Sequence, residues 1–434
     1  MNRRVVITGM GLVCPMGHDV ETVWRGMLSG KNGFNYTTIF DASTFPSTFC
    51  AEVKNYDIAR YTKYPEFHKD SNRGSGFVIG ATAQACNQAG IEIETENPTD
   101  GIDRKKMGIY LGAGEGSVEN DVFFDAIAKG WDSAANKMDW DKWAQTAFRD
   151  MSAMTELEQE PNMPAAHIAL MTGARGPTRS CLTACAASTQ AVGEAFKMIQ
   201  KGSADVMFSG GAHSMIHPLG ITGFCRLTAL SKRNDDIYTA SRPFSKTRDG
   251  FVIGEGAAIL ILESLEHAQK RGAKILAELI GYGSSSDAFR VTDMHEDARG
   301  AVQALEAALK DAKINYSDVN YVSTHGTSTS ENDSIETKAL KKVFKDKAKN
   351  TPVSSVKSMM GHLIGATGAA ELITCVLAIR DNILPPTMNL NEPDPELDLD
   401  YVPNEPRKAQ VDIAVNESFG FGGQNNVVVV KRWE

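Results

Sequence analysis

Residues 183–209 read TACAASTQAVGEAFKMIQKGSADVMFS. The run Ala186–Lys201 is compatible with a helix, and the short apolar run Val206–Ser209 is typical of a buried strand. A helix that leads into a buried strand is the repeating unit of α/β proteins. The same alternation continues on both sides of this segment, so we predict an α/β fold.

The other predicted elements follow the same pattern. Strands are expected at Val5–Thr8, Lys106–Leu111, Ala258–Leu262, Tyr321–Ser323, Thr351–Ser354 and Val427–Val430. Helices are expected at Gly74–Ala89, Leu265–Arg271 and Gly300–Ala312. The segment Asp121–Met163, rich in Asp, Lys, Trp and Met, interrupts the alternation. It predicts either an inserted cap or lid, or a surface excursion that pads a dimer interface.

Composition narrows the class of protein. The 434 residues are 42% hydrophobic, which is enough for two to three domain-sized units. A net charge of −9 argues against general binding to nucleic acid. The chain has no signal-peptide pattern and no run of eighteen apolar residues, so we expect a cytoplasmic protein without membrane contact. Seven cysteines without C-x₂-C spacing predict reduced thiols.

Neither a cofactor nor a metal is expected. Gly9 and Gly11 follow a predicted strand, but Cys14 occupies the third glycine position of a dinucleotide-binding loop. His213 and His217 have a spacing seen among metal ligands, yet no third ligand accompanies them. We therefore interpret both histidines as ordinary loop residues.

Cys185 is the candidate nucleophile. It lies at the start of the predicted helix Ala186–Lys201, where the positive end of the helix dipole favours the thiolate. Its small neighbours leave room for a substrate to approach the sulfur. Taken alone, a buried cysteine is also often a small apolar residue, which is the role expected for Cys181.

Three further loops each carry chemistry at the end of a strand. His325 opens a Gly/Thr/Ser loop, Lys357 and His362 follow Thr351–Ser354, and Ser418–Gly423 reads SFGFGG before the last strand. Together with Cys185 they supply a thiol, two imidazoles, an amine and a flexible aromatic. Such loops meet at one edge of an α/β sheet, so their convergence predicts a catalytic site.

These loops resemble the signature of the β-ketoacyl–carrier-protein synthases of the thiolase superfamily, most closely the elongating type II enzymes of bacterial fatty-acid synthesis. The similarity runs from Val5 to Asn425 and includes the segments Gly173–Pro177, Ser241–Phe244 and Arg248–Phe251. The resemblance implies a thiolase-like fold of two similar halves, 1–272 and 273–434, in five αβαβα layers. It also implies a homodimer formed through the N-terminal half.

The resemblance implies a decarboxylative Claisen condensation with acyl carrier protein as partner. Cys185 would take an acyl group from the carrier's phosphopantetheine arm, and the N–H groups of Cys185 and Phe421 would form the oxyanion hole. His325 and His362 would stabilise the enolate formed when a malonyl thioester loses CO₂. Phe419 and Phe421 would flank a mobile gating loop. No metal or organic cofactor is required.

Supporting roles are implied for other residues. They are Lys357 with Glu371 for the electrostatics, Asp333 and Glu336 for holding the His325 loop, Thr327 and Thr329 for the pantetheine amides, and Glu115 and Phe224 for the acyl pocket. Docking of an acidic carrier requires basic residues near the entrance. The candidates for this role are Lys69, Arg226, Lys232 and Arg233.

Three positions depart from the family's pattern. Glu115 stands where an apolar residue or glycine is usual near the acyl-chain end, so either it turns to a partner across the dimer or the chain is short or polar. Glu417 replaces an asparagine and Gln424 a threonine, and both could retune the gating loop. Segment Asp121–Met163 is longer than its counterpart and is expected near the pocket mouth.

Other members of the superfamily remain as alternatives. A ketosynthase of a specialised polyketide-like pathway would share the site but accept another starter. A non-catalytic chain-length subunit lacks the nucleophile, so Cys185 argues against it. His362 distinguishes the chain from priming synthases, which usually carry asparagine there, and Phe419 and Phe421 stand where degradative thiolases carry a second cysteine.

Overall fold

The computed structural model describes residues 3–116 and 119–434. Its centre is a ten-stranded mixed sheet in the order β12-β11-β15-β16-β10-β1-β9-β8-β4-β7. These strands are β1 (Val5–Val13), β4 (Met107–Ala113), β7 (Thr178–Cys181), β8 (Val206–His213), β9 (Gly256–Ser264), β10 (Ala277–Ser286), β11 (Tyr321–Ser323), β12 (Val353–Ser354), β15 (Ile413–Gly420) and β16 (Gln424–Lys431).

The two halves of the sheet have the same five-strand topology. From the centre outward, the first half runs β1-β9-β8-β4-β7 and the second β10-β16-β15-β11-β12. Corresponding pairs also have the same sense: the two inner pairings are antiparallel and the two outer ones parallel. The halves meet where Val5–Ile7 of β1 pairs antiparallel with Ala277–Leu279 of β10.

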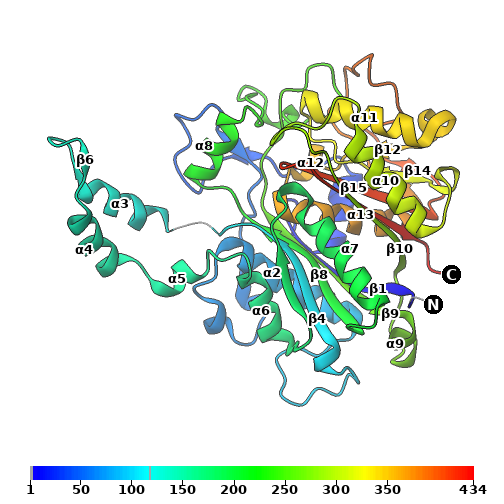
Figure 1. The fold of residues 1–434 in the computed structure, drawn as a ribbon, viewed down its shortest axis with the longest axis horizontal. Coiled ribbons are helices and arrows are strands. Elements are labelled where there is room, and N and C mark those ends of the chain that lie inside the picture. Colours follow the sequence, from blue (N-terminus) through cyan, green and yellow to red (C-terminus); the bar gives the residue numbers. More distant parts are fainter. Residues whose placement is uncertain (1–2, 117–118) are drawn as a thin grey trace.

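Helices complete five layers (Figure 1). The central helices α7 (Ala187–Gln200) and α13 (Thr367–Asp381) pack on each other and on both halves of the sheet. On the outside, α2 (Arg73–Ala89) and α6 (Met163–Thr172) cover the first half, while α10 (Arg299–Ala312) backed by α11 (Ser330–Phe344) covers the second. In α13 every residue from Thr367 to Ile379 is buried, as a helix between two sheets requires. The predicted αβαβα fold is confirmed.

Shorter elements connect these layers. The helices are α1 (Val20–Leu28), α8 (Pro218–Arg226), α9 (Leu265–Lys270) and α12 (Lys357–Met360). The two-residue strands are β2 (Asn35–Tyr36), β3 (Phe49–Cys50), β13 (Ile383–Leu384) and β14 (Arg407–Lys408). None of the helices in residues 3–116 and 119–434 has both the length and the apolar character needed to cross a bilayer.

The sequence pattern missed three strands of the sheet. β7 is an edge strand whose Thr178 and Arg179 are exposed, so it lacks an apolar run. β10 and β15 carry glycine, serine, asparagine or glutamate among their apolar residues. The predicted loop Ser418–Gly423 was wrong for its first three residues, which belong to β15 and pair with β16. A turn remains between Gly420 and Gln424.

Segment 119–158 forms an arm that projects from the body (Figure 1). It comprises α3 (Asn120–Gly130), β5 (Trp131–Asp132), β6 (Lys137–Met138), α4 (Trp140–Asp150) and α5 (Ala153–Leu157), with α3 packed on α4. No described residue of the arm lines the cavity at Cys185, whereas Gln159, near the end of the predicted segment, lines a neighbouring cavity, so the choice between a cap and a dimer-interface excursion stays a prediction. Trp140 and Phe148 are 67% and 91% exposed.

Candidate active site

Cys185 sits on a sharp turn between β7 and α7. It occupies a single 3₁₀ turn, Ala184–Ala186, in which Ala184 adopts φ +48°. A left-handed alanine is a strained conformation of the kind found at functional sites. The second half repeats this turn at Ile364–Ala366, again with φ +48° at its first residue, but carries Gly365 where the first half has Cys185.

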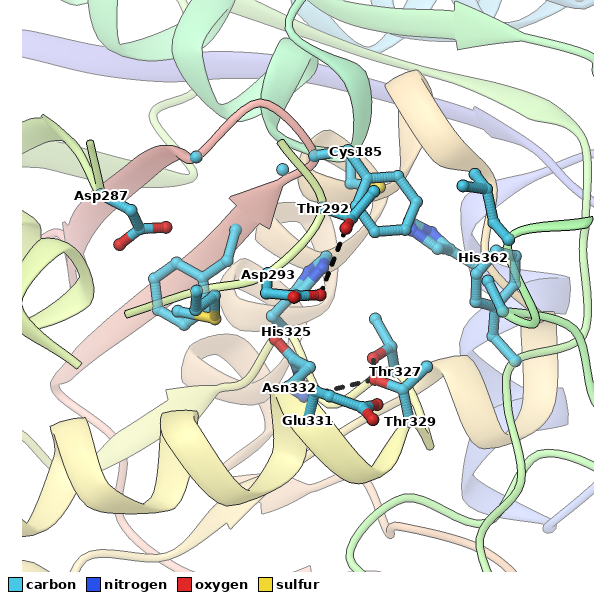
Figure 2. A pocket seen from close by; sticks show the side chains of 18 of the residues that line it. Cys185, Asp287, Thr292, Asp293, His325, Thr327, Thr329, Glu331, Asn332 and His362 are labelled. Carbon is cyan, nitrogen blue, oxygen red and sulfur yellow. Dashed lines mark hydrogen bonds between the residues drawn. The ribbon is translucent and has the colours of Figure 1, made fainter. Parts of the chain in front are cut away.

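Both halves contribute to a cluster around the thiol (Figure 2). The sulfur of Cys185 and one nitrogen each of His325 and His362 all lie within 4.8 Å of one another. His325 follows β11, and His362 lies between α12 and α13. The two rings stand edge to face with centroids 5.6 Å apart. Three such atoms could also ligate a metal ion, and the expectation of a metal-free site stays a prediction.

The resting state of the nucleophile differs from the prediction. Burial raises the pKa of the Cys185 thiol to about 11, while Lys357 and the backbone N–H groups of Phe421 and Cys185 act to lower it. Burial therefore disfavours the expected thiolate, because desolvation outweighs the favourable helix end. The two N–H groups near the sulfur are the donors expected to form the oxyanion hole.

Both histidines are held in the neutral form. Burial lowers the pKa of His325 and of His362 well below the usual value, and Lys357 lowers both further. His362 Nδ1 lies 2.8 Å from the hydroxyl of Thr367, while its buried Nε2 has no partner among the described residues. If Nδ1 accepts the Thr367 hydroxyl, Nε2 carries the proton and is free to donate it in a hydrogen bond.

A buried ion pair lies behind the cluster. The Lys357 ammonium is 2.5 Å from the Glu371 carboxylate, and both side chains are 0% exposed. Burial raises the pKa of Glu371 to about 7 against the opposing effect of Lys357. Lys357 influences the pKa values of Cys185, His325 and His362, so it sets the charge felt by the whole cluster.

Two carboxyl groups hold the His325 loop from behind. Glu336 accepts the backbone N–H groups of His325 and Gly326. Asp333 accepts the N–H groups of Ser328 at 3.2 Å and of Phe244 at 2.8 Å. Neither carboxyl lines the cavity at Cys185, so both act on the loop and not on a bound molecule.

A cavity of about 200 Å³ leads to the thiol. Thr327 and Thr329 line it with hydroxyls 2.9 Å apart (Figure 2), and Phe419 and Phe421 line it as well. Sequence reasoning missed its acidic lining, formed by Asp287, Asp293 and Glu331. No apolar periodicity marked the loop between β10 and α10, from which the two aspartates come. No lysine or arginine is among the described residues that line this cavity.

Three of the four basic docking candidates lie in the chain segment around Leu227, and the fourth, Lys69, lies in another segment. Arg226 ends α8 directly before Leu227, a cavity residue, and Lys232 and Arg233 follow in the same segment. Arg226 and Lys232 are exposed, and Arg233 is half-buried. Lys69 follows the 3₁₀ turn Pro65–His68 and is not among the described residues that line the cavity.

A second cavity, of about 390 Å³, adjoins the first and shares Leu227 with it. Glu115 and Phe224, both expected at the acyl pocket, line this same cavity. His217 lines it as well, whereas His213 is buried beside it at the end of β8. The histidine pair is thus brought next to Glu115, a relationship that sequence spacing did not reveal.

Comparison with known proteins agrees with this geometry. Residues 2–268 match the family described as Beta-ketoacyl synthase, N-terminal domain, and residues 276–391 match its C-terminal domain. The 3-oxoacyl-[acyl-carrier-protein] synthase 2 of Staphylococcus aureus (strain COL) is 42% identical over 433 residues, which cover 100% of this chain and 99% of that protein.

Solved structures give the same result. A Beta-ketoacyl synthase from Burkholderia phymatum STM815 superposes with a TM-score of 0.87 at 31% identity. A type II PKS ketosynthase, solved as AntDE:AntF in complex with its acyl-carrier protein and bound to the hexaketide, superposes with a TM-score of 0.85 at 32% identity. Both matches cover 100% of each chain. This chain belongs to the β-ketoacyl synthase family.

Proposed function

We propose that this protein catalyses the decarboxylative condensation of an acyl group on Cys185 with malonyl-acyl-carrier-protein, which yields a β-ketoacyl-acyl-carrier-protein in fatty-acid elongation. One observation carries this proposal. A thiol and two neutral imidazoles, drawn from both halves of the fold, lie within 4.8 Å of one another at the end of a cavity. The synthase 2 proteins at about 42% identity carry that activity in their name.

The first stage is acyl transfer to the sulfur. The Cys185 thiol loses its proton and attacks the thioester carbonyl, the pantetheine thiol leaves and takes up a proton, and an acyl-enzyme remains. The N–H groups of Cys185 and Phe421 stabilise the oxyanion. Because burial raises the pKa of the Cys185 thiol to about 11, the proton must be removed during this stage, and Lys357 and the two N–H groups favour the thiolate that forms.

The second stage forms the carbon–carbon bond. The malonyl carboxylate leaves as CO₂, and its electron pair moves into an enolate whose oxygen accepts hydrogen bonds from His325 and His362. Neutral imidazoles are suited to this task because a positive ring would hold the carboxylate by charge instead. The enolate carbon then attacks the acyl carbonyl, and Cys185 leaves as the thiolate and regains its proton.

The turn after β15 is the proposed gate. Phe421 is half-buried, and the next two residues, Gly422 and Gly423, have φ values of +88° and +76°. Glycine adopts such angles without strain, so this turn can move while β15 and β16 stay paired. Movement of Phe421 would open the path for the malonyl group after acylation.

Intact-protein mass spectrometry tests the assignment. The protein is incubated with acyl carrier proteins loaded from acetyl to palmitoyl, and the adduct is located by peptide mapping. We expect one acyl group on Cys185 and none in Cys185→Ala. Cys181→Ala is the matched control, because its thiol is also largely buried and lies four residues away. An adduct that survives Cys185→Ala would contradict the proposal.

The carrier protein and a second copy of this chain are the proposed partners. β7 is an open sheet edge with exposed Thr178 and Arg179, and the arm presents Trp140 and Phe148 to solvent. An unpaired edge and exposed aromatic side chains favour burial against another chain. Multi-angle light scattering should give twice the chain mass of 47.0 kDa. A monomer at micromolar concentration would contradict the homodimer.

A cytoplasmic location is also proposed. All seven cysteines lie in the described residues and carry free thiols, as expected in a reducing compartment.

The alternative function, a ketosynthase of a specialised polyketide-like pathway, is favoured by one observation. Glu115 and His217 place polar groups in the second cavity, and a hydrocarbon chain could not form hydrogen bonds with them.

A further inference from the structure

The second cavity has an apolar wall and a polar end. Met215, Leu219, Phe224 and Leu227 form the wall, and Glu115, Gln159 and His217 supply polar groups. Leu227 separates this cavity from the one at Cys185. Phe224 also packs edge to face on Phe251 of the first cavity, with centroids 5.6 Å apart. Displacing these side chains would join the two spaces.

His217 presents an unused hydrogen-bond donor to this space. Its Nδ1 accepts the backbone N–H of Gly220 at 3.2 Å and so caps α8. In a neutral imidazole the other nitrogen then carries the proton. That nitrogen, Nε2, is buried and has no partner among the described residues. The side chain as a whole is 8% exposed, and its burial lowers the pKa of the ring, so it stays neutral.

Glu115 supplies the complementary acceptor. It follows β4, while His213 ends β8 and His217 follows it, so the carboxyl ends of two parallel strands converge here. The charge of Glu115 acts on both histidines. His213 does not line the cavity: its Nδ1 accepts the N–H of Gly365, its ring packs on Gly114, and its Nε2 is buried without a partner among the described residues. The Nε2–H donor of His217 and the Glu115 carboxylate are polar groups of this cavity that can form hydrogen bonds with a bound molecule.

We propose that the second cavity receives the far end of the acyl group carried on Cys185 and selects chains that end in a hydroxyl or carboxamide. The inference rests on the proposed condensing function. A hydroxyl or carboxamide can accept from His217 Nε2–H and donate to the Glu115 carboxylate at once. A methyl end satisfies neither group, a carboxylate end is repelled by Glu115, and an ammonium end offers His217 no acceptor.

The test uses five acyl carrier proteins whose acyl chains have equal length and end in methyl, hydroxyl, carboxamide, carboxylate or ammonium. Each pair competes for the full-length protein, and adducts on Cys185 are counted by mass spectrometry. We expect the hydroxyl and carboxamide chains to label at least tenfold faster than the methyl chain. In Glu115→Leu the methyl chain should label faster than the hydroxyl and carboxamide chains. His217→Asn, which keeps a cap for α8, should reduce the difference in labelling rate between them.

Glu160→Leu is the matched control, since Glu160 is exposed near the arm's root and does not line the cavity. It should keep the wild-type order. Preference for methyl, carboxylate or ammonium chains, or an order unchanged in Glu115→Leu, would overturn the inference while leaving the condensing function intact. Labelling by none of the five chains, nor by any simple acyl carrier protein, would overturn the proposed function and this inference with it.

Discussion

The Glu336 carboxylate accepts the backbone N–H of His325 at 2.6 Å, and it accepts that of Gly326 at 2.7 Å. It is the buried anchor of the loop that carries a catalytic imidazole, although it lies eleven residues further along the chain. Glu417 of β15 is also buried, and neither of its carboxyl oxygens has a hydrogen-bond partner among the described residues. Burial and the neighbouring Glu336 raise the pKa of Glu417 well above its usual value, which favours its protonated form.

Glu336→Ala should therefore impair condensation more than acylation. The substitution leaves two buried N–H groups unsatisfied, at about 1–3 kcal/mol each, and frees the His325 loop. We expect malonyl decarboxylation to fall at least tenfold while Cys185 still accepts an acyl group. Radiolabelled malonyl turnover and intact mass measure the two steps separately. Glu405→Gln, at an exposed site, is the control, and an equal loss in both steps would count against the loop role.

Glu417→Gln should change the pH dependence of stability. Burial and Glu336 raise the pKa of Glu417 well above its usual value, so its contribution is full below about pH 4.5 and is lost as pH rises toward the folded pKa. Glutamine does not titrate, so the stability of the variant relative to the wild type should rise between pH 5 and pH 8. Urea unfolding at both pH values measures this, and a constant difference would refute it.

Malonyl decarboxylation should persist below the usual pKa of histidine. Burial and Lys357 lower the pKa of both His325 and His362, so both rings stay neutral as pH falls through 6.5. A Cys185→Gln variant isolates this step, because its amide stands in for the acyl-cysteine carbonyl. We expect a flat rate from pH 8 to pH 6.5 and a decline only below that range. A midpoint at 6.5 would mean that the rings are not held neutral.

Lys357→Met should destabilise the fold by about 3–5 kcal/mol, because one partner of a buried ion pair is left alone. Adding Glu371→Leu should restore much of the loss, since the uncompensated carboxyl is then gone. Denaturant unfolding of the two single variants and the double variant gives the coupling energy between Lys357 and Glu371. If the loss of unfolding free energy in the double variant equals the sum of the losses in the single variants, the two side chains are not coupled.

Alkylation of Cys185 should report the raised thiol pKa. With a pKa of about 11, the rate of reaction with iodoacetamide should still rise between pH 8 and pH 10, where an ordinary thiol approaches its plateau. Peptide mapping separates Cys185 from the other six cysteines, and Cys181→Ala provides a simpler background. A plateau below pH 7 would show a resting thiolate instead.

The sequence by itself determined the fold class and the identity of the reacting groups. Cys185 stands at the start of a predicted helix, whereas His325 and His362 lie in loops that come after predicted strands, and α/β folds bring such loops to one edge of the sheet. The long apolar strands and the central helices were likewise visible, because their burial leaves a local pattern. The polar strands β7, β10 and β15 leave no such pattern, and they were missed.

Tertiary structure alone decided the protonation and the surroundings of those groups. Burial, which no local pattern reports, raises the pKa of the Cys185 thiol and the pKa values of the Glu336 and Glu417 carboxyl groups. The meeting of Glu115 with His217 joins residues about a hundred positions apart, and the projection of the arm from the body left no local pattern in the sequence. A pKa or a pocket depends on which distant residues exclude water together, and only the packed chain fixes that.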